Sequence, residues 1–343
     1  MTFVIRFFFL LFPLVAMAED KVLNIYAWTG EIPDYVIQQF EQETGIKVNF
    51  SEYENNEIMY AKLRASPNAG YDMIIPSSNI ADRMARQDML APLDKSLLPN
   101  WKNINPNFIN PVFDPTSKYC APFIWGVTGI FVNTAYYPPQ SIKKWSDLWD
   151  PKYQNHLLMI DDIRDNFSIT LITLGYSVND TNPAHLKEAF LKLKRLMSNV
   201  KVFSTDMVVS IIIDEDATLG MAWNGDAYKA SEENHHIKFI FPEDGFMIWI
   251  DSLAIPKNAP HIKEAHQFIN FLLRPDIAKA IALYTGYPTA NLAGQNLLPA
   301  NIRDNPTVYP SKEVLRHGQY QLDLSNDTLA LIEKYWEELK MSD

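Results

Sequence analysis

Short hydrophobic runs alternate with segments of helical periodicity along the first hundred residues. Val22–Trp28 is a mainly apolar run typical of a buried strand, and the apolar residues of Asp34–Thr44 recur at helical spacing. Apolar residues alternate at Ile46–Phe50, which predicts a second strand, and Ile58–Ala65 and Tyr71–Pro76 repeat the pattern as a helix and a short strand. This order predicts a parallel sheet with right-handed crossovers.

The rest of the chain continues the alternation. Further strands are predicted at Leu157–Ile160, Leu219–Trp223 and Ile248–Ile255, and further helices at Pro183–Met197 and Ile262–Leu273. The 343 residues favour about two domains, yet neither an internal repeat nor a long linker divides the chain. We therefore expect an α/β protein with two lobes, between which the chain crosses more than once.

The first eighteen residues have the pattern of an export signal. Arg6 supplies a basic start, and the apolar run Phe7–Val15 is too short to span a bilayer of ~30 Å. Ala16–Ala18 is an A-x-A cleavage signal, which places the start of the mature chain near Glu19. A hydrophobic first strand is the alternative. No later segment has 18 uninterrupted apolar residues, so we expect an exported protein that does not span the membrane.

Composition excludes several classes of protein. Hydrophobic residues make up 47% of the chain and charged residues 21%, which supports sizeable cores and argues against disorder. The 41 acidic and 30 basic residues give a net charge of −11. No nucleic-acid partner is expected, because phosphate backbones attract clustered Lys and Arg. Cys120, the single cysteine, lies among apolar residues and is expected to pack in a core.

Most signatures of catalysis are missing from the sequence. It contains no G-x-S-x-G, Walker A, H-E-x-x-H or C-x-x-C motif, and its 12 glycines disfavour a phosphate-binding loop. The histidines are scattered: His261 and His266, for example, would lie about 140° apart around a helix. We expect no metal and no cofactor. A hydrolase that uses two carboxylates remains the enzymatic alternative, because spacing alone does not exclude it.

Aromatic and polar residues gather where the predicted strands end. They are Trp28 and Thr29 at the end of the first strand, Ser77, Ser78 and Asn79 after the third, Asp161 and Asp162 after Leu157–Ile160, and Trp223, Asn224, Gly225 and Asp226 at the end of another strand. In open α/β sheets, ligands bind in the crevice beyond the carboxyl ends of the strands. We therefore expect these side chains to line one site.

Trp249 and Asp251 are two residues apart in a predicted strand, so their side chains point to the same side. An aromatic face next to a carboxylate suits an alkylammonium group. The ring attracts the cation by about 0.5–2 kcal/mol, and the carboxylate accepts N–H bonds worth about 1.5–3 kcal/mol. Core packing is the alternative for any single tryptophan.

Asp162 and Asp165 are three residues apart at a predicted helix start, and so are neighbours on one face. They have two readings: acids that cap the helix, or acids that bind a cation. Both readings can hold for Asp162, because a helix N-terminus keeps a carboxylate ionised.

Eleven stretches, in order along nearly the whole mature chain, match those of a known family. They are Tyr26–Thr29, Phe40–Val48, Met59–Leu63, Tyr71–Ser77, Phe123–Gly126, Trp145–Trp149, Asp161–Arg164, Leu219–Gly225, Trp249–Pro256, Phe268–Asp276 and Thr285–Thr289. In them the chain resembles the periplasmic polyamine-binding proteins, which deliver spermidine and putrescine to ATP-binding-cassette (ABC) importers.

The resemblance implies a periplasmic-binding-protein fold, in which two α/β lobes with interwoven chain crossings enclose a ligand cleft and close by hinge bending. On this basis we expect residues 1–18 to be the signal peptide. Residues 19–124 and 248–295 would form lobe 1, and residues 125–247 and 296–343 would form lobe 2.

The resemblance also implies roles for individual residues. Trp28, Trp223, Trp249 and Tyr287 match the aromatic walls, Asp162, Asp165 and Asp251 match the ammonium-binding acids, and Thr29, Ser77, Thr205 and Gln321 match polar contacts. Two positions depart from the family pattern. Spermidine-type members carry Glu and Tyr where this chain has Gly30 and Glu31, and an aromatic residue where it has Asn79. Glu31 and Asn79 are candidate contacts, and the choice among putrescine, spermidine and spermine stays open.

We therefore expect a monomeric periplasmic protein that binds a polyamine and delivers it to inner-membrane ABC permease subunits without chemical change. A regulatory protein that senses polyamines is the alternative among binding proteins. A neighbouring permease and ATPase gene would favour transport, and a neighbouring membrane kinase or cyclase gene would favour sensing.

Overall fold

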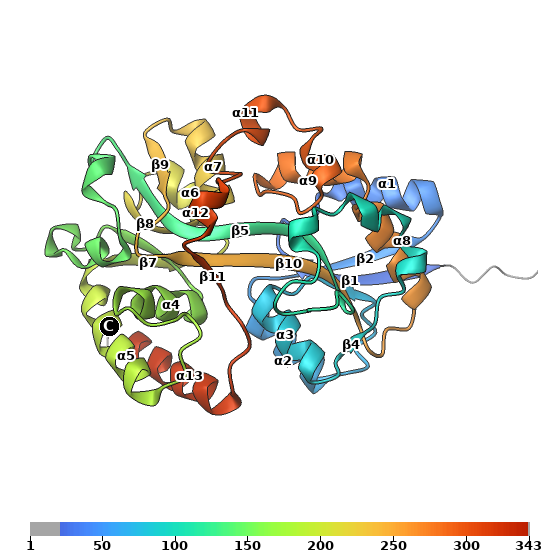
Figure 1. Ribbon diagram of the computed structural model, residues 1–343, viewed down its shortest axis with the longest axis horizontal. Coiled ribbons are helices and arrows are strands. Elements are labelled where there is room, and N and C mark those ends of the chain that lie inside the picture. The colour runs from blue at the N-terminus through green and yellow to red at the C-terminus, as the bar shows by residue number, and fades with distance from the viewer. Residues whose placement is uncertain (1–20, 342–343) are drawn as a thin grey trace, which may run out of the picture.

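The computed structural model describes residues 21–341, in which helices flank one mixed β-sheet (Figure 1). The expected signal peptide, residues 1–18, lies outside the described residues. The strands are β1 (Val22–Trp28), β2 (Lys47–Tyr53), β3 (Met73–Ile74), β4 (Leu90–Ala91), β5 (Cys120–Asn133), β6 (Leu157–Ile160), β7 (Val200–Ser204), β8 (Leu219–Trp223), β9 (Ile237–Ile240), β10 (Phe246–Pro256) and β11 (Gly318–Tyr320). The helices are α1 (Asp34–Thr44), α2 (Asn56–Ala65), α3 (Ser78–Arg86), α4 (Ile163–Thr173), α5 (Pro183–Leu196), α6 (Val208–Ile213), α7 (Asn224–Glu233), α8 (Ile262–Leu272), α9 (Pro275–Thr285), α10 (Leu292–Gln295), α11 (Ala300–Arg303), α12 (Lys312–Leu315) and α13 (Asn326–Lys340).

The strand–helix alternation predicted for the first hundred residues is confirmed. β1 pairs in parallel with both β2 and β3, and α1 and α2 are the helices between them. The side chain of Asn55 starts α2 by accepting a hydrogen bond from the Ile58 amide at 2.8 Å. β6 likewise pairs in parallel with β7 and β8, so each end of the sheet has the expected parallel arrangement.

Two long antiparallel strands, β5 and β10, join these parallel ends and run across the width of the molecule (Figure 1). The sheet order is β2-β1-β3-β10-β5-β8-β6-β7, with β4 and β11 also paired to β10 and β9 to β5. The sheet is therefore mixed, not wholly parallel. Pro122 is tolerated in β5 because the register shifts opposite Asp251 and Ser252, where a bulge interrupts the ladder.

The hydrophobic interior forms two main clusters. The first core cluster lies between β1–β3 and helices α1, α2 and α8, and includes residues 120–127 of β5, among them the buried Cys120. The second core cluster lies around β6, β8, α4, α5 and α13, and includes Ile130 and Val132 of the same strand. These clusters are the interiors of two α/β lobes, and β5 and β10 pass from one lobe to the other.

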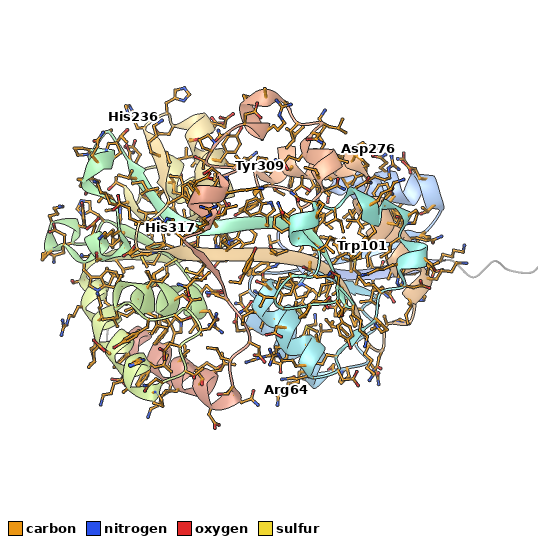
Figure 2. All side chains as sticks on the ribbon, in the orientation of Figure 1. Arg64, Trp101, His236, Asp276, Tyr309 and His317 are labelled. Atoms are coloured by element: carbon orange, nitrogen blue, oxygen red, sulfur yellow. The ribbon has the colours of Figure 1, made fainter. Side chains whose placement is uncertain are left out.

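The C-terminal part of the chain crosses between the lobes once more. Tyr309 and Leu322 pack against the first core cluster, whereas Leu324 and Trp336 belong to the second. Figure 2 labels Tyr309, whose hydroxyl accepts a hydrogen bond from the Thr289 amide at 3.2 Å. Three segments therefore link the lobes, as expected for interwoven crossings.

Candidate ligand-binding site

A cavity of about 470 Å³ lies between the two lobes. Its lining residues are Trp28, Thr29, Gly30, Glu31, Asn56, Ser77, Asn79, Ile124, Asp162, Asp165, Thr205, Asp206, Val208, Val209, Trp223, Asp226, Lys229, Trp249, Asp251, Tyr284, Thr285, Tyr287 and Gln321. All of the candidate residues from the resemblance are among them, whereas four of the other strand-end residues are not: Ser78, Asp161, Asn224 and Gly225. The structure therefore brings together side chains that are nearly 300 positions apart in the chain.

The first lobe contributes the residues that follow β1 and β3. Trp28 ends β1, and Thr29 and Glu31 come directly after it. Ser77 and Asn79 lie at the start of α3, where the buried side chain of Asn56 accepts a hydrogen bond from the Ser77 amide at 3.2 Å. The carboxyl ends of β1 and β3 therefore lie at the cavity, which is where ligands bind in open α/β sheets.

The second lobe contributes residues from several segments on the other side of the cavity. Asp162 and Asp165 start α4, Thr205 follows β7, and Trp223 ends β8. Gln321 directly follows β11, on the segment that crosses between the lobes.

Strand β10 passes between the two sides, and its residues Trp249 and Asp251 both line the cavity. Tyr287, which also lines the cavity, follows α9. The alternation within the predicted strand therefore identified two side chains that share one face.

Three aromatic rings form a continuous wall. Trp249 makes edge contacts with Trp223, at 6.1 Å between ring centroids, and with Tyr287, at 5.3 Å. Trp28 packs against Tyr53 at 4.9 Å on the other side. These contacts, edge-to-face for Trp249 and tilted for Trp28, fix the ring planes, which leaves π-faces and edges available to the methylene groups or cations of a ligand.

Gly225 allows Tyr287 to approach the start of α7. A Cβ atom at this position would come within 2.2 Å of the Tyr287 ring. Only glycine leaves room for the tyrosine, so a residue outside the lining determines the position of a wall residue.

Asp251 and Glu31 are buried carboxylates of the first-lobe side, with 6% and 5% of their surface exposed. The Ser77 hydroxyl donates a hydrogen bond to Asp251 at 2.5 Å. Burial raises the pKa of Asp251 to about 7, and this hydrogen bond opposes the shift. Burial, and next the charge of Asp251, raise the pKa of Glu31 well above its ordinary value.

Asp165 and Asp162 are the acids of the second-lobe side. Asp165 accepts hydrogen bonds from Gln321 at 2.9 Å and Thr128 at 3.1 Å, while burial, and next the charge of Asp162, raise its pKa to about 7. Asp162 accepts a hydrogen bond from the Asp165 amide at 2.8 Å, so it does cap α4. It also lines the cavity, and the two interpretations of this residue are compatible.

Asp226 is an acid of the cavity that the sequence places after a strand end but to which the resemblance assigns no role. The Tyr287 hydroxyl donates a hydrogen bond to it at 2.7 Å, and burial raises its pKa to about 7. Its position three residues after Trp223, in the first turn of α7, was the available signal. Nothing in the sequence indicated that Tyr287 would reach it.

The cavity is strongly acidic. Six of its lining side chains are carboxylates, and Lys229 is the only basic residue among the described residues that line it. Within residues 21–341, no group of three or more His, Cys, Asp or Glu side chains could hold a metal ion. The arrangement can therefore stabilise an organic cation, through carboxylates that accept N–H bonds and aromatic faces that contact methylene groups.

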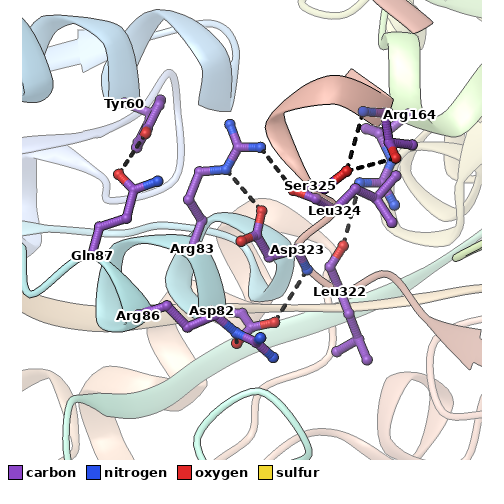
Figure 3. Close-up of polar contacts among 11 residues, drawn as sticks. Tyr60, Asp82, Arg83, Arg86, Gln87, Arg164, Leu322, Asp323, Leu324 and Ser325 are labelled. Atoms are coloured by element: carbon purple, nitrogen blue, oxygen red, sulfur yellow. Dashed lines mark hydrogen bonds and ion pairs between the residues drawn. The ribbon is translucent and has the colours of Figure 1, made fainter. Parts of the chain in front are cut away.

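Polar contacts also bridge the lobes beside the cavity (Figure 3). Arg83 of α3 pairs with Asp323 at 2.8 Å, and the Asp323 amide donates to Asp82 at 3.2 Å. Arg164 of α4 donates to the Leu322 carbonyl oxygen at 3.3 Å. These contacts hold residues 322–323 between helices of the two lobes, directly after the cavity residue Gln321.

Comparison with known proteins gives a consistent result. The family model described as bacterial extracellular solute-binding protein matches residues 36–310. The spermidine/putrescine-binding periplasmic protein of Salmonella typhimurium is 41% identical over 323 residues, which cover 94% of this chain and 92% of the relative. The putrescine-binding periplasmic protein PotF of Escherichia coli is 31% identical over 316 residues, 87% of this chain and 85% of the relative.

Among solved structures, a putative spermidine/putrescine ABC transporter from Listeria monocytogenes superimposes with a TM-score of 0.91 at 35% identity, covering 94% of this chain and all of that one. In the described part of the chain, no helix has the length and hydrophobicity needed to cross a membrane. Fold, cavity and relatives agree, and the chain belongs to the bacterial extracellular solute-binding protein family.

Proposed function

We propose that this protein captures a polyamine, spermidine or putrescine, in the cavity between its lobes and delivers it to an ABC permease in the membrane. The observation that carries the proposal is the set of buried carboxylates beside three aromatic rings. Relatives named as spermidine/putrescine-binding proteins, at 41% identity over nearly the whole chain, support it.

The cavity residues have complementary roles in this proposal. Trp28, Trp223, Trp249 and Tyr287 contact the methylene chain, and carboxylates at both sides accept N–H bonds from the ammonium groups. Micromolar affinity corresponds to about −8 kcal/mol, which a few desolvated ion pairs and stacking contacts can supply after the cost of ordering. Because the acids lie at separate points, amine spacing would set the preference.

The proposed cycle has no chemical step. The ligand holds the lobes together through contacts to both, and the closed form is what the permease subunits recognise. We propose that the protein is a monomer exported to the periplasm after cleavage near Ala18/Glu19. Its lobes would divide at β5 and β10, close to residues 124 and 248, and once more in the C-terminal part of the chain.

Titration calorimetry of purified, ligand-stripped protein tests the binding proposal. Putrescine, spermidine, spermine and agmatine are titrated separately, and at least one should bind with micromolar or tighter affinity and be recovered unchanged. The absence of binding by all four would overturn the proposal. Recovery of a hydrolysed product would instead favour the carboxylate-hydrolase alternative.

A further inference from the structure

Glu31 and Asp251 are brought together by the register of three strands. Tyr26 of β1 lies opposite Ile74 of β3, which in turn lies opposite Ala254 of β10. Three residues further along, Ser77 forms a bridge with Asp251. The residues that follow β1 therefore reach the cavity at the level of Asp251.

A tight turn directs Glu31 back toward this point. Gly30 has a φ of 70°, in the left-handed region that favours glycine, and the Glu31 amide donates to the Trp28 carbonyl oxygen at 3.3 Å. Glu52, which is exposed, fixes the turn by accepting a hydrogen bond from the Gly30 amide at 2.9 Å. As a result, the Gly30-Glu31 pair carries an acid into the cavity.

Neither carboxylate has a cationic partner among the described residues. Both oxygens of Glu31 are buried and accept no hydrogen bond within residues 21–341. Asp251 accepts one, from Ser77. Both carboxylates are buried in one cavity, and burial and the charge of Asp251 disfavour the ionised form of Glu31, so without a cation the pair retains a proton.

The other titratable groups nearby do not supply that cation. Tyr53 of β2 and Tyr287 after α9 are both influenced by the charges of Glu31 and Asp251, and burial raises the pKa of each phenol well above its ordinary value. Asp226 on α7 is a further acid of the cavity, and Lys229, on the same helix, is the only base that lines it within residues 21–341. A cation that neutralises Glu31 and Asp251 would therefore have to come from outside the chain.

We propose that Glu31 and Asp251 form a two-carboxylate subsite that binds one ammonium end of the ligand, and that binding displaces the proton that this pair retains. The proposal rests on the proposed polyamine function and adds a specificity-determining residue, Glu31. The ammonium group arrives already protonated and donates N–H bonds to both carboxylates. The displaced proton passes to the solvent, so affinity rises with pH until the pair has lost its proton.

Calorimetry in buffers with different ionisation enthalpies measures this proton. Spermidine and putrescine are titrated at pH 7 in phosphate and in Tris, and the dependence of the observed heat on buffer enthalpy gives the number of protons released. For the native protein we expect about one proton from this pair, with any release from Asp165 or Asp226 added to it. Glu31→Gln should release about one proton fewer and bind at least about tenfold more weakly.

Glu54→Gln is the matched control, because Glu54 is an exposed acid of the neighbouring loop that does not line the cavity. It should match the native protein in affinity and in proton release. Thermal unfolding establishes that both variants are folded. Binding by the native protein without proton release, or equal release by Glu31→Gln, would overturn this inference and leave the polyamine function intact. Failure of every polyamine to bind the native protein would overturn the function itself.

Discussion

At the scale of single residues, the cavity depends on contacts that composition does not reveal. The net charge of −11 suggested a cationic partner only weakly. What favours a cation is that Asp165 and Asp251 are buried and Asp226 is half-buried beside aromatic rings, with pKa values raised by desolvation to about 7. An external cation would reverse these shifts, because it stabilises the ionised carboxylates.

Gly225→Ala tests whether the aromatic wall depends on the close approach of Tyr287 to position 225. The added methyl group would meet the Tyr287 ring at 2.2 Å, so the ring must move away from Trp249 and Asp226. We expect polyamine affinity to fall at least about tenfold and the protein to lose about 1–3 kcal/mol of stability. Calorimetry and thermal unfolding measure the two effects. Tyr287→Phe, which removes only the hydroxyl, should be milder in both, and native affinity in Gly225→Ala would contradict this account of the wall.

At the scale of elements, the predictions succeeded where one local pattern decides the structure. β1, α1, β6 and β8 have the predicted bounds because continuous apolar runs or helical periodicity specify them. β5 was not predicted, because Pro122 interrupts its strand propensity and its burial on both faces removes any alternation. The contact of Asp226 was not predicted for a related reason: it depends on Tyr287, which is 61 residues away.

The start of α4 allows the two roles of Asp162 to be separated. Asn is as good an N-cap as Asp, so Asp162→Asn should keep stability within about 0.5 kcal/mol of the native value. It removes the negative charge, and polyamine affinity should fall at least about fivefold. Asp162→Ala should lose both affinity and about 0.5–2 kcal/mol of stability. If Asp162→Asn binds polyamine as the native protein does, Asp162 acts as a helix cap alone.

At the scale of the whole molecule, the affinity for the ligand depends on the free-energy difference between the open and closed arrangements of the lobes. The Arg83–Asp323 pair bridges them without lining the cavity. Arg83→Gln should therefore weaken polyamine binding, by about 1 kcal/mol or fivefold, through loss of the closed form. Arg303→Gln removes an exposed pair with the adjacent Asp304 and is the control. Equal affinities in calorimetry would mean that the bridge does not contribute to closure.

The buried acids also predict how stability depends on pH. In the folded, ligand-free protein the pKa values of Asp165, Asp226 and Asp251 are about 7, above the 3.8 of a free side chain, so folding favours their protonated forms. This contribution is complete below about pH 4 and is lost as pH rises through about 7. We expect the Tm of ligand-free protein to fall between pH 5 and 8, by about 2–4 °C for each kcal/mol lost.

Saturating polyamine should flatten or reverse this fall, because the bound cation favours the ionised acids. Scanning calorimetry at several pH values, with and without ligand, measures both curves. A Tm that rises from pH 5 to 8 in ligand-free protein would contradict the prediction.

The three consecutive residues 321–323 connect the cavity with the contacts between the two lobes. The Gln321 side chain donates a hydrogen bond to Asp165 in the cavity, and two positions later Asp323 forms an ion pair with Arg83 on α3. If Asp165 moves when the ligand binds, residues 321–323 would carry that movement to α3 of the other lobe. A partner that contacts only the outside of both lobes would then distinguish the loaded protein from the empty one without touching the ligand.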